Sequence, residues 1–356
     1  MNQNAPVDWP AAARLGARLA SPGPATDRDE AAGLVDGLRR AAGVAAGYVA
    51  EITALAPADG SDPEVVPVSH VMVVDRPGWA RANTELLATL TAPDAATGDA
   101  PSRLTRLAGA AQVGGVLALL AGKVLGQFDP FVRTTGPGGV VRGRLLLVAP
   151  NVLQLERDLR IDPEDFRLWV ALHEQTHAMQ FAAAPWLAEH LRTRTVVLLG
   201  DLASDDDDRD RGRAVATMVV RMLRGDGDAP GLESLLRPDE LQVFEEVGAV
   251  MALLEGHADV AMDAVGDTVV PTVRRIRARF EARRSGAGQG PADRVLRRLL
   301  GLDLKLAQYR DGAAFVRGVT AAVGQRGLNA VWAAPANLPR PREITDPRAW
   351  VRRVHG

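Results

Sequence analysis

The sequence predicts a mainly helical α+β fold, in which a small sheet lies next to one central helix. Three observations support this: apolar residues recur at helical spacing along most of the chain, strand-like stretches are short and few, and one helical stretch contains His-Glu-x-x-His. The chain has 356 residues, 47% of them apolar, which is enough for one large core or two smaller ones. We expect a mostly helical region over residues 1–130 and a second region, carrying the motif, over residues 131–356, which together form one compact unit.

The N-terminal region is expected to contain four helices and one short strand. Apolar spacing predicts helices over residues 11–19, 29–55, 79–90 and 102–127, and a strand over residues 65–75. The last of these helices is very apolar but interrupted by glycines, so we expect a buried central helix rather than a membrane span. His70, in the strand, has no ligand-like spacing around it and is expected to be structural.

The His-Glu-x-x-His motif lies in a run over residues 166–184 whose apolar residues have helical spacing, and a helix start precedes this run. Asp162 supplies an N-cap, a proline fits the first helical position, and acidic residues follow in the first turn. The motif therefore lies in mid-helix. Because histidines at i and i+4 share one helix face, His173 and His177 can bind one Zn²⁺ while Glu174 reaches a water on the metal.

The second half of the chain is expected to be helical, apart from one strand ahead of the motif. That strand is predicted over residues 142–151. Further helices are predicted over residues 186–199, 213–224, 238–263 and 270–284, with a charged surface loop over residues 204–211. The proline-containing tail is expected to be an extended segment that wraps around the body.

Composition excludes several classes of protein and site. The formal net charge of −2 does not favour a nucleic-acid partner, and the arginines of the helix over 270–284 are expected to aid solubility. No cysteine is present, so disulfides and thiolate metal sites are excluded. The sequence shows no secretory leader and no run of about 18 apolar residues, so we expect a cytoplasmic protein without a membrane partner.

A catalytic zinc needs a third protein ligand and one position open to water. The extended motif with a third histidine is absent, because glutamine and alanine stand at its glycine and histidine positions. In the helix over 238–263, Glu255 could bind the metal. Asp259, four residues later on the same face, could accept a hydrogen bond from the far nitrogen of a ligating histidine and so fix its orientation. His257 points about 200° away from Glu255 and is the rival ligand if the helix breaks between them, and His190 is a further possibility.

These motifs resemble known metallopeptidases. Glu-x-x-x-Asp after His-Glu-x-x-His resembles the gluzincins, whose third zinc ligand is a helix glutamate. Four segments together resemble an actinobacterial family of zincin-like hydrolases, labelled zinc-dependent metalloprotease or coenzyme F420 biosynthesis-associated protein; they are residues 173–181, 185–187, 253–263 and 301–312. The resemblance covers nearly the whole chain and implies a zincin-like metallopeptidase fold with a metal site.

The resemblance also implies roles for other parts of the chain. In zincins an edge strand beside the active-site cleft binds extended peptide by strand addition, and the strand over residues 142–151 is placed where that strand would be. The alternative is a buried strand next to a core helix, which needs no such role. Zincins often use a tyrosine or histidine to stabilise the tetrahedral oxyanion, so Tyr309 is a candidate, with a core tyrosine as the alternative.

The sequence therefore predicts a zinc metallopeptidase or related hydrolase of peptide or amide bonds, with one Zn²⁺ per chain held by His173, His177 and Glu255. The metal would lower the pKa of its water, and Glu174 would act as general base and pass the proton to the leaving amine. One alternative is a binding or regulatory protein on the same scaffold, linked to coenzyme F420 metabolism. A di-iron site would need a second Glu-x-x-His, which the sequence lacks.

Overall fold

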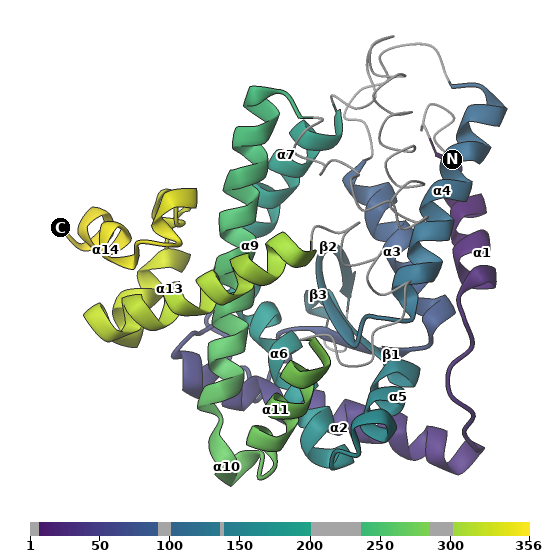
Figure 1. Ribbon diagram of the computed structural model, residues 1–356, viewed down its shortest axis with the longest axis horizontal. Helices are drawn as coiled ribbons and strands as arrows, with labels where there is room; N and C mark the ends of the chain where they lie inside the picture. Colours follow the sequence, from purple (N-terminus) through teal and green to yellow (C-terminus); the bar gives the residue numbers. More distant parts are fainter. Residues whose placement is uncertain (1–6, 92–100, 136–138, 201–235, 285–301) are drawn as a thin grey trace. The chain divides into compact units, whose positions relative to one another are not determined.

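The computed structural model describes residues 7–91, 101–135, 139–200, 236–284 and 302–356 (Figure 1). Many helices and one three-stranded sheet confirm the predicted mainly helical fold with a small sheet. The chain divides into two compact units: unit 1 consists of Met1–Val49, Gly60–Met179 and Asp267–Val273, and unit 2 of Ala50–Asp59, Gln180–Gly266 and Arg274–Gly356. The boundary expected at residue 130 falls within unit 1.

Unit 1 contains the sheet and most of the helices of the first half of the chain. Its helices are α1 (Trp9–Leu19), α2 (Arg28–Thr53), α3 (Arg76–Leu90), α4 (Arg103–Ala121), α5 (Ala149–Leu159) and α6 (Pro163–Ala183), with the short α10 (Gly266–Val269). Both α2 and α6 continue into unit 2 at their C-terminal ends. Each of these two helices, including α6, which carries the motif, therefore contributes residues to both units.

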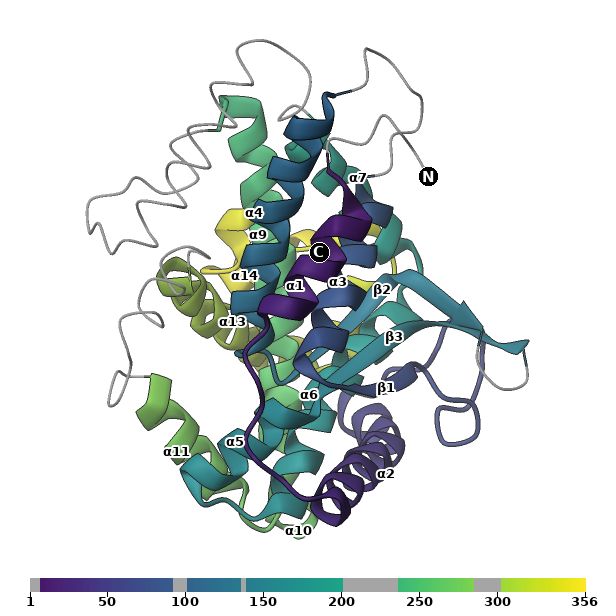
Figure 2. The same ribbon diagram turned by 90° about the vertical axis from the view of Figure 1, so that its right-hand side faces the viewer.

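The sheet has the strand order β1-β3-β2 and is seen beside α3 in Figure 2. Its strands are β1 (His70–Val74), β2 (Gly126–Thr135) and β3 (Val141–Val148); β3 is parallel to β1 and antiparallel to β2. The run from Leu145 to Val148 is completely buried, as in a strand covered on both faces. The substrate-binding edge strand that the resemblance implied for residues 142–151 is therefore contradicted, because β3 is the central strand of the described sheet; the alternative, a buried strand without that role, fits it.

The sequence did not predict β2. Its pairing with β3 shifts register between Asp129 and Arg133, and this irregularity includes a proline, which obscures the alternation typical of a strand. The carboxylate of Asp129 is buried and accepts hydrogen bonds from Nε and Nη2 of Arg144 at 3.2 and 2.7 Å. This ion pair joins β2 to β3 where the strand bulges.

α4 buries only one face, which corrects the prediction of a buried central helix. Gly114 on that face lies against α1, where an added Cβ would be 2.9 Å from the carbonyl oxygen of Ala12. On the other face Leu104 is 79% and Leu119 49% exposed. By length and composition α4 is also the one described helix that could cross a membrane, but its buried face packs within unit 1 on α1 and α3.

Unit 2 is formed by helices. They are α7 (Trp186–Gly200), α9 (Pro238–Ala264), α11 (Val273–Arg284), α13 (Leu302–Leu328) and α14 (Pro347–His355), with the 3-10 helices η4 (Asn329–Trp332), η5 (Pro335–Asn337) and η6 (Pro341–Glu343). The helix predicted over 213–224 and the charged loop over 204–211 lie outside the described residues.

The tail is folded rather than extended, which corrects the sequence prediction. Prolines open η5, η6 and α14, where a missing N–H costs no helical hydrogen bond. Trp350 of α14 is completely buried, and its Nε1 donates to the carbonyl oxygen of Asn337 at 2.7 Å. The prolines thus start short helices that pack onto unit 2.

Candidate metal centre

The helix with the metal motif, α6, begins where the sequence predicts. Oδ1 of Asp162 accepts hydrogen bonds from the backbone N–H groups of Glu164 and Asp165 at 3.0 and 3.1 Å, and a proline occupies the first helical position. The helix continues to Ala183. The motif therefore lies in the helix interior, where the direction of each side chain is set by the helical repeat.

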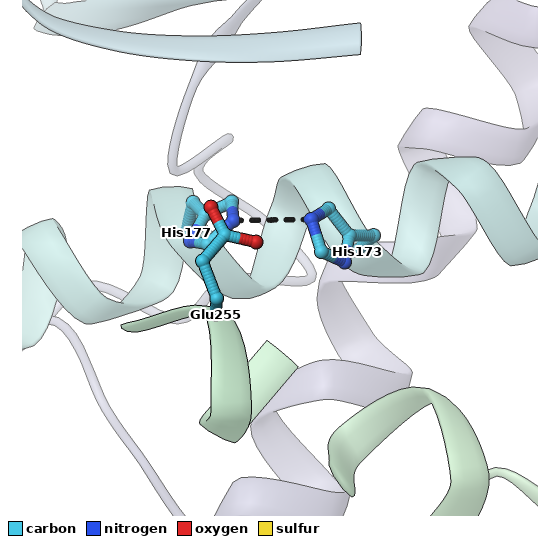
Figure 3. Close-up of side chains that lie close together, drawn as sticks. All are labelled: His173, His177 and Glu255. Carbon is cyan, nitrogen blue, oxygen red and sulfur yellow. Dashed lines mark hydrogen bonds between the residues drawn. The ribbon is translucent and has the colours of Figure 1, made fainter. Parts of the chain in front are cut away.

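His173 and His177 lie on the same face of α6, one turn apart. Their Nε2 atoms are 3.2 Å apart, and the two rings are nearly perpendicular, at 89° (Figure 3). Two nitrogen ligands of one tetrahedral zinc, each about 2.0–2.1 Å from the metal, lie about 3.3 Å apart. The spacing of the two imidazoles thus fits a shared zinc ion.

Glu255 on α9 adds a carboxylate to the two imidazoles. One ligand atom from each of His173, His177 and Glu255 lies within 4.8 Å of the other two, and Figure 3 shows the carboxylate beside the imidazole nitrogens. All three side chains are half-buried. Two imidazoles and one carboxylate form a donor set found in catalytic zinc sites, which leave one position open.

A buried glutamine connects the end of α6 to α9. Nε2 of Gln180 donates to the carbonyl oxygen of Leu254 at 3.0 Å, and both residues belong to unit 2. Gln180 is on the same helix as the histidines, and Leu254 directly precedes Glu255. This hydrogen bond therefore joins the helix of the two histidines to the turn of α9 that carries the carboxylate.

Glu174, the general base expected from the sequence, is buried against the first residue of β2. Its exposed fraction is 6%. A Cβ added to Gly126 would lie 2.6 Å from Cγ and 2.8 Å from Oε1 of Glu174, so the side chain passes directly over this glycine. The absence of a side chain at Gly126 leaves the space that the glutamate occupies.

Asp259 has a different partner from the histidine that the sequence suggested. Its Oδ1 lies 3.8 Å from Nη1 of Arg277, and its backbone carbonyl oxygen accepts a hydrogen bond from Nη2 at 3.2 Å. Arg277, on α11, also forms an ion pair with Asp263, one turn further along α9. The carboxylates of α9 beyond Glu255 thus bind α11 within unit 2.

The two alternative histidine ligands lie in other surroundings. Nδ1 of His257 is 3.0 Å from Nε2 of Gln180, and its ring lies 5.4 Å from that of Trp332. Nδ1 of His190 is 3.4 Å from Nη1 of Arg194, and burial followed by this positive charge lowers the pKa of the His190 imidazole. Within the described residues, the group of ligand atoms around the two motif histidines includes neither of them.

Tyr309 lies on α13, but its side chain is outside what the structure describes. Its role in stabilising an oxyanion therefore stays a prediction. His70 is the first residue of β1 and pairs in register with Arg144 of β3. The structural role expected for it stays a prediction.

The sequence alone assigned no role to Gly126, which touches Glu174, or to Gln180, which bonds to the residue before Glu255. For Gly126 there was no signal, because β2 itself was not predicted. For Gln180 a signal existed: it follows His173 by seven residues, so it lies only about 20° away around the helix and continues the row of ligands.

Comparison with known proteins extends over nearly the whole chain. The sequence profile of a family described as zincin-like metallopeptidase matches residues 7–351. The chain is also similar, at 30% identity and with a TM-score of 0.66, to a crystal structure described as a putative hydrolase with a novel fold from Chloroflexus aurantiacus, over 98% of this chain and 99% of that one. No curated protein sequence matches the chain. Both similarities include α6 and α9, the helices that carry the candidate ligands.

Proposed function

Because the chain belongs to the zincin-like metallopeptidase family, we propose that it is a zinc-dependent hydrolase of peptide or other amide bonds. The observation that carries the proposal is the group of two imidazole nitrogens and one carboxylate oxygen within 4.8 Å of one another. In this proposal His173, His177 and Glu255 hold one Zn²⁺ per chain, and Glu174 is the general base.

The donor set favours zinc over other common divalent cations. Imidazole nitrogen suits zinc, whereas magnesium and calcium prefer sites made of oxygen ligands alone. Three protein ligands leave one position open on a tetrahedral ion. When bound there, the metal would supply Lewis acidity that lowers the pKa of a water and polarises the scissile carbonyl.

Glu174 would carry out the proton transfers. Its carboxylate can take a proton from the attacking water and deliver it to the nitrogen of the leaving amine, so that one residue serves as base and then as acid. Its burial and its contact with Gly126 restrict the positions that the carboxylate can adopt. Such restriction favours the reaction, because small displacements of a catalytic group cost much of its effect.

β2 would supply the edge that binds an extended substrate. Among the described strands β2 pairs with β3 alone, and Gly126 at its start touches Glu174. A peptide that adds to the edge of a sheet is held by main-chain hydrogen bonds and presents its backbone carbonyls in a regular register. We therefore assign the substrate-binding role to β2 instead of the strand over residues 142–151, for which the resemblance implied it.

Metal content and hydrolysis, measured on wild type beside Glu174→Gln, test the proposal. We expect one zinc per chain in both proteins by elemental analysis, and cleavage of a peptide mixture that Glu174→Gln reduces by about 100-fold or more. Glu164→Gln, which neutralises an exposed carboxylate on the first turn of the same helix, is the control and should keep full activity.

Two results would contradict the proposal. Full activity of Glu174→Gln would exclude its role as general base. Wild-type protein that holds no zinc after zinc is supplied would favour the alternative, a binding or regulatory protein on a zincin scaffold. The narrower resemblance, to actinobacterial proteins associated with coenzyme F420 biosynthesis, stays a prediction from the sequence.

A further inference from the structure

Gln180 uses both hydrogens of its side-chain amide within unit 2. Nε2 donates to the carbonyl oxygen of Leu254 at 3.0 Å and lies 3.0 Å from Nδ1 of His257. The side chain is completely buried, and His257 is only 2% exposed. A buried amide with two such bonds has a single orientation, because breaking either bond would leave a polar group without a partner.

The backbone carbonyl of Leu254 determines the direction of every bond in this group. A carbonyl oxygen can only accept, so the atom of Gln180 that faces it must be the amide nitrogen. An amide nitrogen can only donate, so Nδ1 of His257 must accept. The Nδ1 lone pair of His257 is therefore used by Gln180 rather than by a metal.

The bonded groups flank the proposed carboxylate ligand on α9. Leu254 directly precedes Glu255, and His257 follows it by two residues on the opposite side of the helix. On α6, Gln180 is three residues after His177, on the next turn. The amide therefore holds α9 at the residues on either side of Glu255, and it does so from the helix that carries the two histidines.

We propose that Gln180 and His257 are positioning residues that place the Glu255 carboxylate within reach of the two motif histidines. The pair acts through the two hydrogen bonds of the Gln180 amide and does not itself contact the metal. The inference rests on the proposed zinc site, in which Glu255 is the third ligand. Partners of this kind, which hold a ligand in place from behind, typically change metal affinity by about 10- to 100-fold when they are removed.

Zinc affinity, measured by chelator competition on folded protein, tests this role in Gln180→Met. Methionine keeps the length and most of the volume of glutamine but removes both donors. We expect zinc to bind about 10- to 100-fold more weakly than in wild type. Thermal unfolding of the zinc-free proteins is measured in parallel, so that a loss of stability can be separated from a loss of affinity.

Gln175→Met is the matched control. Gln175 is on the same helix and is also buried, at 3% exposure, where its Nε2 donates to the carbonyl oxygen of Ala42 at 2.8 Å and its Oε1 accepts from Ser69 at 3.1 Å. Those partners belong to unit 1 and do not include α9. Both variants should lose similar stability in the zinc-free state, and Gln180→Met alone should lose zinc affinity.

A double-mutant cycle with Glu255→Ala identifies the residue through which Gln180 acts. If Gln180 positions the carboxylate, Gln180→Met should change zinc affinity little once Glu255 is alanine, because the ligand that it positions is gone. An equal change in both backgrounds would overturn the inference. If Gln180→Met does not fold, His257→Phe, which replaces the imidazole by a ring without the Nδ1 acceptor, enters the same cycle with the same expectation.

Two further outcomes keep this inference distinct from the proposed function. Wild type that binds one zinc, together with a folded Gln180→Met of equal affinity, would overturn the positioning role and leave the zinc site intact. Wild type that binds no zinc would overturn both.

Discussion

α6 and α9 both contribute to the candidate metal centre, but they place their side chains by different means. On α6 the local helical repeat is sufficient, because two histidines one turn apart have their Nε2 atoms at 3.2 Å. α9 contributes one carboxylate to the group, that of Glu255. The position of this carboxylate depends on how α9 packs. One part of the site is therefore fixed by neighbours in sequence and the other by contacts between distant segments.

The candidates on α9 show what the packing decides. Residues 255, 257 and 259 all carry side chains that can bind a metal; helix geometry places Glu255 and Asp259 on one face and His257 on another, and packing decides which face meets the histidines. His257 is engaged by Gln180, and Asp259 is drawn to Arg277 on α11. Glu255 is the candidate that lies with the motif histidines. Packing thus selects Glu255 partly because it gives His257 and Asp259 other partners.

We expect the largest effect, a loss of zinc binding, when a ligand is removed from either helix, in His177→Ala on α6 and Glu255→Ala on α9. His177→Ala should abolish stoichiometric zinc binding, since a single imidazole and a carboxylate remain. Glu255→Ala should weaken binding while two imidazoles still hold the metal. Elemental analysis and chelator competition measure both. Glu245→Ala, which removes an exposed carboxylate on α9, is the control. Unchanged affinity in Glu255→Ala would instead point to His257 or His190 as third ligand.

A second prediction concerns Gly126, where β2 meets Glu174 of α6, the proposed general base. In Gly126→Ala the new Cβ would lie 2.6 Å from Cγ of Glu174, which is closer than two carbon atoms can approach. The obstacle is a side chain rather than backbone, so we expect the fold to survive and the carboxylate to move. A displacement of about 1 Å at a catalytic group can cost about 100-fold in rate. We therefore expect kcat/KM to fall by about 100-fold while zinc is retained.

The control for Gly126→Ala is Gly115→Ala on α4, where an added Cβ meets nothing within 4 Å. It should leave activity unchanged. Full activity in Gly126→Ala would show that Glu174 tolerates displacement and would argue against its role as general base. Zinc lost together with activity would show that the glycine supports α6 as a whole rather than this one carboxylate.

The sequence predicted the features of the site that depend on neighbouring residues, and it missed those that depend on contacts between distant segments. The Asp162 cap, the course of α6 and the shared face of its histidines depend on residues within a few turns of one another, and the structure agrees with them. The bulged strand β2 and the Asp259 contact depend on which distant segments meet. Sequence spacing carries no information about Arg277 approaching from α11, and the continuous apolar run of β3 fits a central strand as well as an edge strand.

The smallest expected effect tests whether the packing of α9 is as rigid as this comparison implies. α9 and α13 touch at backbone distance: a Cβ on Gly312 would lie 2.0 Å from the carbonyl oxygen of Ala252. No rotamer change can relieve a contact with backbone, so Gly312→Ala must move the helices apart and should destabilise the protein by about 1–3 kcal/mol, measured by denaturant unfolding. Gly43→Ala, at an exposed site on α2 with nothing within 4 Å, should instead be neutral or stabilising.

Because Ala252 lies one turn before Glu255, Gly312→Ala should also weaken zinc binding. A loss of stability with wild-type affinity would mean that Gln180, rather than the α13 contact, sets the position of the carboxylate.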